Sequence, residues 1–329
     1  MRSRKIIQFS VGLLFSAGFV YLIARSIPIN GTMAALTNVK YSWVAAGVTL
    51  FAIGYLSRIR RWQLMLKNEN PDVGFGRTGL PFMISIAANN VLPFRLGDVM
   101  RAFAFSKWLA VPSSSVLATL VAERLLDLLA LLAALGLAVF FLGLGQGAIA
   151  TLLGAGSLVL VALAVVIAIA FVYPQIAQPI VMFFVRLIAP RLGKVGERLS
   201  NAIENIFETL KMITRSGRIL ALIFWTAAAW IGEAGVFLCA AYAVPAMSAP
   251  FAAFLAMPVG TLSTLLPSSP GYIGTFHFFV IEAAKLMGNA PAAATAFAVV
   301  AHLIMWVTAT LVGGVCFAIW SFLGFRNER

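Results

Sequence analysis

Residues 89–98, Asn-Asn-Val-Leu-Pro-Phe-Arg-Leu-Gly-Asp, interrupt an apolar segment that runs from 78 to 108. Proline removes a backbone donor and glycine permits turns that other residues avoid, so the chain can reverse near Pro93 and Gly97. The interrupted segment is too broken to form one membrane-crossing helix, and each of its halves is too short to cross alone. We therefore predict a re-entrant helical hairpin over 78–108.

The composition around this hairpin is that of a membrane protein. The chain has 329 residues, of which 61% are hydrophobic and only 11% are charged. Soluble domains are about 45–50% apolar and about 25% charged, so a soluble enzyme, a disordered tail and a nucleic-acid-binding module are excluded. Apolar runs near 20 residues recur, whereas short alternating strands do not. The sequence predicts an all-α polytopic membrane protein.

Six apolar runs are long enough to cross a bilayer. They are 6–25, 41–57, 113–143, 148–173, 218–244 and 290–323. Six crossings place both termini on one side, within a single membrane domain, 1–329. The first run follows Arg2, Arg4 and Lys5 and could be read as a signal peptide, but it is longer than the 7–15 residues of a signal core, which favours an uncleaved helix.

The basic residues indicate the orientation of these crossings, because cytoplasmic loops are enriched in Lys and Arg. With both termini in the cytoplasm, 18 basic residues lie inside and three lie outside. The inner set comprises Arg2, Arg4, Lys5, Arg58, Arg60, Arg61, Lys67, Arg77, Lys107, Arg186, Arg191, Lys194, Arg198, Lys211, Arg215, Arg218, Arg326 and Arg329. The outer set is Arg25, Lys40 and Lys285, and Trp62 and Trp108 are expected at the inner interface. This assignment requires both interrupted segments to be re-entrant.

A second break resembles the first. Residues 266–271, Leu-Pro-Ser-Ser-Pro-Gly, repeat the Leu-Pro pair with a glycine four positions after the proline, here Pro267 and Gly271. The surrounding segment, 250–288, predicts a second re-entrant hairpin. The stretches 41–143 and 218–323 then each read as span, hairpin, span, with opposite topology. Inverted repeats of this kind build midplane sites in transporters.

The region 174–217 carries an amphipathic pattern. Apolar residues recur at steps of three and four: Val195, Leu199, Ile203, Ile206, Leu210 and Ile213. We predict a cytoplasmic amphipathic helix within 174–217. Its apolar face either lies on the anionic lipid of the inner leaflet or docks against the bundle, and the pattern leaves both open.

Ionisable residues within the expected spans require a reason, since each costs about 2.5–3.5 kcal/mol at the bilayer centre on insertion scales. Glu123 lies ten residues into its span, roughly 15 Å deep at about 1.5 Å per residue. Asp127 shares its helix face, and Arg124 can pair with Asp127. Glu233 and His302 lie in the opposite repeat. These residues either form a neutral patch joining helices or a substrate site, with Glu123, Glu233 and His302 as proton-coupling candidates.

The two breaks also favour anions. Arg95 and Arg101 flank the first break, and Asp98 lies three residues before Arg101, so an Asp98–Arg101 pair is the purely structural alternative. At the second break, Ser268 and Ser269 precede a proline, as a helix cap does. Helix N-termini carry partial positive charge that attracts anions. We predict that these residues, with Glu123, Arg124 and Asp127, bind the head group of a substrate.

Patterns for catalysis and cofactors are missing from the sequence. It contains no phosphate-binding Gly-Lys-Ser/Thr loop, no His-Glu-x-x-His motif and no hydrolase elbow. Cys239 and Cys316 both lie in apolar runs without metal-binding spacing. We therefore expect no metal, no cofactor, no nucleic-acid partner and no catalytic residue.

The sequence resembles the flippase-like membrane domain family, also called the lysylphosphatidylglycerol synthase transmembrane domain family. The motifs that carry the resemblance are 58–62 (Arg-Ile-Arg-Arg-Trp), 90–101, 123–127 (Glu-Arg-Leu-Leu-Asp) and 266–274. The resemblance implies re-entrant helices and lipid translocation, as in the membrane half of the multiple peptide resistance factor. The soluble aminoacyl-transfer domain of that factor does not follow Arg329 in this sequence, so we expect no synthesis of lysyl-lipid by it.

These observations together predict a lipid flippase or scramblase of a prokaryotic cytoplasmic membrane. Its substrate would be a lipid with a polar head, such as a phospholipid or a polyprenyl-phosphate conjugate. The arginines at the first break suit an anionic head group, whereas Glu123 and Asp127 equally suit a cationic aminoacyl head, and the sequence leaves both open. Two alternatives are an intramembrane lipid-modifying transferase and an accessory subunit of a cell-envelope lipid synthase. A homodimer and a partner lipid-synthesising enzyme stay open as partners.

Overall fold

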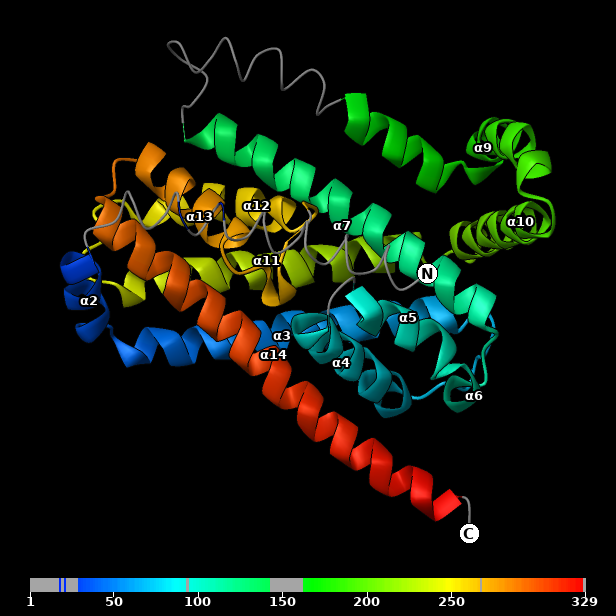
Figure 1. The fold of residues 1–329 in the computed structure, drawn as a ribbon, viewed down its shortest axis with the longest axis horizontal. Helices are drawn as coiled ribbons and strands as arrows, with labels where there is room; N and C mark the ends of the chain where they lie inside the picture. The colour runs from blue at the N-terminus through cyan, green and yellow to red at the C-terminus, as the bar shows by residue number, and fades with distance from the viewer. Residues whose placement is uncertain are drawn as a thin grey trace.

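The computed structural model describes residues 29–92, 95–142, 162–266 and 268–327, together with Gly18 and Tyr21. Every regular element in these ranges is a helix; α3 and α11 run side by side, and α14 crosses them obliquely (Figure 1). The prediction of an all-α polytopic membrane protein is confirmed.

The elements follow the chain in two blocks separated by a peripheral pair of helices. The first block contains α2 (Ile29–Thr37), α3 (Tyr41–Leu66), α4 (Phe75–Val91), α5 (Leu96–Phe103), α6 (Ser106–Leu109) and α7 (Ser113–Phe141). The peripheral part contains α9 (Pro174–Ile188), η2 (Ala189–Leu192) and α10 (Lys194–Arg215). The last block contains α11 (Ile219–Ala243), η3 (Pro250–Ala252), α12 (Ala253–Ser263), η4 (Pro270–Tyr272), α13 (Thr275–Leu286) and α14 (Pro291–Asn327).

Four helices of the described part are long and apolar enough to cross a membrane. They are α3, α7, α11 and the Pro291–Phe322 part of α14. The expected span 6–25 lies outside the described residues except for Gly18 and Tyr21. The expected span 148–173 is described only as the helix Ala162–Val172, which meets the following helix at a bend of 103°, so this pair counts as a fifth span only if both parts form one crossing.

Helix α3 is longer than the sequence predicted. The expected span ended at residue 57 because charged residues follow, whereas the helix continues to Leu66. Arg58 and Arg61 lie within it, and the Arg61 side chain is buried at 1% exposure. Trp62 is also fully buried inside the helix bundle, and its depth at the inner interface stays a prediction. Two of the basic residues counted as cytoplasmic therefore face the interior of the helix bundle.

The chain reverses at both sequence breaks. Arg95 adopts left-handed backbone angles (φ 51°) just before α5, and α5 then packs back along α4. Gly97 makes this contact possible, because a Cβ there would collide with the carbonyl oxygen of Ser85 in α4. In the second block α12 and α13 pack against each other in the same way. Pro93 and Pro267 lie outside the described residues, and entry of the two hairpins from opposite membrane faces stays a prediction.

The two blocks are joined by crossed packing. Helix α3 lies along α11, α4 packs against α14, and α12 packs against α7. At the α3–α11 crossing, Gly54 and Gly232 let the backbones approach closely, since a Cβ on Gly232 would lie 3.1 Å from the Cα of Gly54. Small residues at such crossings are typical of membrane helices. Each hairpin therefore rests on the last long helix of the other block.

The region 174–217 forms two helices, α9 and α10, where one was expected. The predicted apolar stripe of α10 divides along its length. Leu210 and Ile213, near its C-terminal end, are buried against α3 and α7 through Met65 and Leu126. Val195 and Leu199, near its N-terminal end, are exposed. Docking against the bundle thus applies to one half of α10, and binding of the other half to anionic inner-leaflet lipid stays a prediction.

Candidate functional site

A cavity of about 460 Å³ lies between the two blocks, with walls from α3, α4, α5, α7, α11 and α12. Its charged lining residues are Arg58, Arg61, Arg95, Arg101, Glu123, Arg124, Asp127 and Glu233. Sequence analysis predicted Arg95, Arg101, Glu123, Arg124 and Asp127 as substrate-binding residues, and the structure brings all five to this cavity. Aromatic side chains of Tyr55, Phe82 and Trp230 complete its walls.

The deepest charges form a buried chain between α3, α5 and α7. The guanidinium of Arg101 donates to Oε2 of Glu123 at 2.6 Å, and Arg61 donates to Oδ1 of Asp127 at 2.7 Å. A second nitrogen of Arg61 lies 3.9 Å from Glu123. Glu123 and Asp127 share a helix face, as their spacing predicted, so one arginine can serve both.

Arg58 connects the two blocks. One of its terminal nitrogens donates to Oε2 of Glu233 in α11 at 2.5 Å, and the other lies 3.5 Å from Asp127 in α7. Its Cζ also lies 4.6 Å from the ring centre of Trp230. Trp230 in turn donates from its indole nitrogen to Asp127 at 3.2 Å. A single side chain therefore links α3, α7 and α11 at the cavity wall.

Asp98 of the first hairpin binds Arg124 of α7. The guanidinium of Arg124 donates to Oδ2 of Asp98 at 2.9 Å, and the side-chain amide of Asn89 donates to Oδ1 at 3.0 Å. Two local pairs considered from the sequence, Arg124 with Asp127 and Asp98 with Arg101, are not the ion pairs formed. The reason is tertiary: α3 supplies arginines to Asp127, which leaves Arg124 to the hairpin.

Arg95 differs from the other cavity arginines because, among the described residues, it pairs with no carboxylate. Its Nε donates to the Tyr272 hydroxyl at 3.1 Å, and a terminal nitrogen lies 3.3 Å from the Thr264 carbonyl oxygen. Both partners belong to the second hairpin region. Arg95 therefore joins the turns of the two hairpins through neutral oxygens, and its charge is uncompensated by an anion.

Several buried polar atoms of the chain of charges lack hydrogen-bond partners. Within the described residues these atoms are Nε of Arg61, Nε and Nη1 of Arg101, and Oε1 of Glu123. Arg101 lies between two rings, with Cζ 4.6 Å from the ring centre of Trp62 and 4.8 Å from that of Phe82. Cation–π contacts of this kind partly replace the lost hydration of a guanidinium. The orphaned donors leave capacity for further acceptors at the cavity.

The charged side chains of the site sum to a net positive charge. Five arginines, including Arg95, face four carboxylates, if Asp98 is included through its bond to Arg124. Isolated charges are expensive within a bilayer and persist when they pair with one another. Pairing accounts for four arginines and leaves the charge of Arg95. The arrangement therefore favours a small anionic group in the cavity.

A smaller cavity of about 120 Å³ adjoins the first and shares Tyr55, Glu233, Thr261 and Thr264 with it. His302 lines this smaller cavity, with its ring centre 4.7 Å from that of His277. Of the three proton-coupling candidates, Glu123 and Glu233 therefore reach the main cavity, whereas His302 reaches only its neighbour. Their role in proton coupling stays a prediction.

The second sequence break contributes less to the cavity than expected. Ser268 and Ser269 are half-buried before the 3₁₀ turn η4, and Ser269 makes no side-chain cap bond there. The α-helix of the second arm begins later, at Thr275. Ser269 occupies the N-cap position of η4 with Pro270 next to it, as predicted, but Gly271 (φ 72°) and Gly274 (φ 91°) turn the chain before α13, whose N-cap is Gly274. Their contact with a substrate stays a prediction.

Sequence reasoning missed Arg58 and Arg61 as site residues. It placed both in a cytoplasmic loop, although they belong to the family motif of residues 58–62. The signal that would have found them is helical spacing, since 58 and 61 are three apart and follow an apolar run without a helix breaker. A second signal is the need of buried Asp127 and Glu233 for positively charged partners, which Arg61 and Arg58 provide.

Fold and site together define a polytopic membrane protein with a charged cavity buried in its helix bundle. The chain belongs to the family described as "Lysylphosphatidylglycerol synthase TM region", whose model matches residues 9–313. The resemblance noted from the sequence is thus confirmed. Membership of this family indicates a membrane protein with a lipid-related function.

Two curated relatives match the chain. It is 26% identical over 333 residues to "Glycosyltransferase AglD" of Haloferax volcanii, a match that covers 92% of this chain and 53% of that protein. It is 25% identical over 129 residues to "UPF0104 membrane protein MJ1595" of Methanocaldococcus jannaschii, covering 39% of this chain and 38% of that one. The matches therefore span about half, or less, of the length of either relative.

Proposed function

We propose that this protein is a lipid flippase or scramblase that moves a lipid with an anionic head group between the leaflets of a prokaryotic cytoplasmic membrane. The observation that carries the proposal is the positive, partly unsatisfied cavity inside the bundle, in which Arg95 has no carboxylate partner within the part of the chain that the structure describes. A head group that crosses a bilayer needs polar contacts along its path, and this cavity supplies them.

The residues divide into two roles under this proposal. Arg95 and Arg101 bind the phosphate, since among the described residues the first has no counter-ion and the second has two nitrogens without acceptors. Glu123 and Asp127, with Asp98, orient the arginines through the ion pairs described above. Gly97 shapes the hairpin that presents Arg95 to the cavity.

Transport follows from an exchange of partners at Arg95. In the present conformation Arg95 donates to Tyr272 and lies close to the Thr264 carbonyl oxygen, so it ties the first hairpin to the second. A phosphate oxygen is a stronger acceptor for a guanidinium than a phenol or a carbonyl group. Binding of the head group would therefore release the tie between the hairpins, and the two blocks could then move apart on one face. Glu123, Glu233 and His302 would couple this movement to protons.

The proposal is tested with purified protein in liposomes that contain a fluorescent lipid with a phosphodiester head group. An impermeant quencher added outside reaches only the outer leaflet, so wild-type protein should make the inner-leaflet lipid accessible to it by exchange between leaflets. Arg95→Gln should slow this exchange about tenfold or more, as expected for loss of a charge-assisted contact. Arg186→Gln removes an exposed arginine of α9 and serves as the control. Exchange that is unaffected by Arg95→Gln would contradict the assigned role. A transport rate independent of pH would remove the proton-coupling candidates.

A lipid-modifying transferase is the second candidate, because one relative is named a glycosyltransferase. An accessory role beside a lipid-synthesising enzyme is supported by the partial coverage of that relative. Asp98, Glu123, Asp127 and Glu233 are each paired with an arginine, so a transferase would have to break one of these ion pairs before a carboxylate could act as its base. In the same liposomes supplied with a glycosyl donor, labelled lipid that gains the mass of the transferred group without changing leaflet would decide for the transferase.

A further inference from the structure

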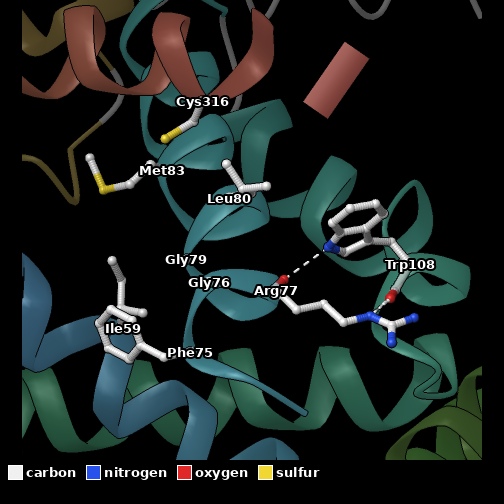
Figure 2. Close-up of a pocket in the computed structure, with 9 residues that line it drawn as sticks. All are labelled: Ile59, Phe75, Gly76, Arg77, Gly79, Leu80, Met83, Trp108 and Cys316. Atoms are coloured by element: carbon white, nitrogen blue, oxygen red, sulfur yellow. Dashed lines mark hydrogen bonds between the residues drawn. The ribbon is translucent and has the colours of Figure 1, made fainter. Parts of the chain in front are cut away.

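A second hollow lies on the outer side of the first hairpin, away from the charged cavity. It measures about 710 Å³ and is lined by residues of α3, α4, α6 and α14, beginning with Phe75 at the start of α4 (Figure 2). This volume is within the roughly 300–1,000 Å³ of small-molecule sites. The same helices separate it from the main cavity, because neighbouring residues of α4 face opposite ways: Phe82 lines the cavity and Met83 lines the hollow.

The hollow is a trough along one face of α4. Gly76, Gly79, Leu80 and Met83 recur at helical spacing, so they share a face, and the two glycines leave it without side chains near its start. No heavy atom lies within 4 Å of a Cβ built on Gly76. Met83 is buried at the base, and Cys316 of α14 lies beside it at the far end (Figure 2). The trough is therefore apolar along about 10 Å of helix.

The rim of the trough carries one fixed cation. Nε of Arg77 donates to the carbonyl oxygen of Trp108, and the Trp108 indole donates back to the carbonyl oxygen of Arg77 at 2.9 Å (Figure 2). These two bonds close the base of the first hairpin and hold the Arg77 side chain beside the trough. Among the described residues the terminal nitrogens of Arg77 have no carboxylate partner, and the lining contains no acidic residue.

We propose that this trough binds a phospholipid with an anionic head group, with an acyl chain along α4 and the phosphate on Arg77. An apolar channel ending at a positioned arginine and an aromatic ring matches the distribution of polarity in such a lipid. Arg and Trp are also the residues that anchor membrane proteins at the head-group level. The site is separate from the charged cavity and does not depend on the transport proposal.

Cys316 allows the site to be tested directly, because the chain has only one other cysteine. In the full-length Cys239→Ala protein, alkylation of Cys316 by N-ethylmaleimide is followed by mass spectrometry in two kinds of vesicle, phosphatidylcholine alone and phosphatidylcholine mixed with phosphatidylglycerol. Phosphatidylcholine has the same phosphate but offsets its charge with choline, so the anionic lipid should bind Arg77 more tightly and slow alkylation about tenfold. Arg77→Gln should abolish this difference, whereas Arg77→Lys, which keeps the charge, should retain part of it.

Two further variants separate occupancy of the trough from general effects. Gly79→Leu fills the trough and should remove the dependence on lipid, while Gly136→Leu, at a position of α7 with open space around it, should leave the dependence intact. Equal alkylation rates in both vesicles, or a lipid effect that survives Arg77→Gln, would overturn the proposal. Protection that is independent of lipid and falls on dilution of the protein would identify a second copy of the chain as the occupant instead. Arg95→Gln should not alter the protection, so failure here and failure of transport are distinguishable.

Discussion

The two halves of the molecule, residues 41–141 and 219–327, place long helix, broken hairpin and long helix in the same order, yet their interiors differ in chemistry. The first half supplies seven of the eight charged residues that line the main cavity, and the second supplies only Glu233. The core of the second half instead packs alanines such as Ala240, Ala256 and Ala301 around Phe237 and Phe297.

This difference indicates a division of labour. Close alanine packing fixes helix positions through many small contacts, while buried ion pairs fix side chains at the expense of desolvation. The first half therefore supplies the charged groups of the cavity and depends on its buried ion pairs for stability. The second half provides a closely packed frame of helices against which those ion pairs are held. Arg58 with Glu233 and Arg95 with Tyr272 are the points where chemistry and frame meet.

The largest expected effect is at Arg101, whose side chain is 1% exposed and pairs with Glu123. Arg101→Ala leaves the Glu123 carboxylate with only the distant Arg61 at 3.9 Å, and loss of one partner of a buried pair costs about 3–5 kcal/mol. The measurement is the free energy of unfolding in mixed detergent micelles. Arg124→Ala is the control, since that side chain is 45% exposed, and it should cost far less. Equal losses for both variants would mean that the buried pairs do not stabilise the first half.

The hairpins give the second comparison. Gly97→Ala places a methyl group against the backbone oxygen of Ser85, which cannot move without distorting α4, so we expect a loss near the upper end of the roughly 1–3 kcal/mol of overpacking. In the second hairpin, Gly260→Ala meets the Cγ2 atom of Val280, a side chain that can rotate. The second variant should lose less stability by the same unfolding measurement. A larger loss at Gly260 would reverse our view of which hairpin is the more tightly constrained.

The link between halves is tested by a double-mutant cycle on Arg58 and Glu233. Each single change, Arg58→Gln or Glu233→Gln, leaves a partly buried charge without its closest partner. The double variant removes both charges, so its loss should be smaller than the sum of the single losses by about 1–2 kcal/mol. Arg58 also approaches Asp127, so part of its effect should remain in the Glu233→Gln background. Strict additivity would show that this contact does not join the halves.

Much of this fold could be predicted from the sequence because hydrophobicity and chain breaks act locally. The apolar runs that begin at 113, 218 and 290 match α7, α11 and α14 within a few residues, and the breaks near Pro93 and Pro267 coincide with the reversals of the chain. The error at α3 arose because a charge was taken to end a span. Whether Arg58 and Arg61 lie outside the membrane or face the interior of the helix bundle depends on carboxylates from other helices. The local sequence pattern around residue 58 carries no information about those carboxylates.

The site shows the same limit. Glu123, Asp127, Arg95 and Arg101 were identified because ionisable residues inside apolar segments are conspicuous. Their partners were not, because spacing along one helix suggested pairs such as Arg124 with Asp127, while packing of α3 and α5 against α7 determines the pairs formed. The identities of these four residues could therefore be predicted from the chain, whereas Arg58, Arg61 and the ion pairs themselves required the fold.

The smallest expected effect is at the ion pair of the second half that lies away from the cavity. Lys285 donates to Glu282 at 2.7 Å across one turn of α13, but the two side chains are 31% and 44% exposed. Exposed pairs of this type contribute about 0–1 kcal/mol, because water competes for both charges. Lys285→Gln should therefore change the free energy of unfolding by less than about 1 kcal/mol and leave lipid exchange unchanged. A loss as large as that of Arg101→Ala would mean that ion pairs matter equally in both halves, and the division between chemistry and frame would fail.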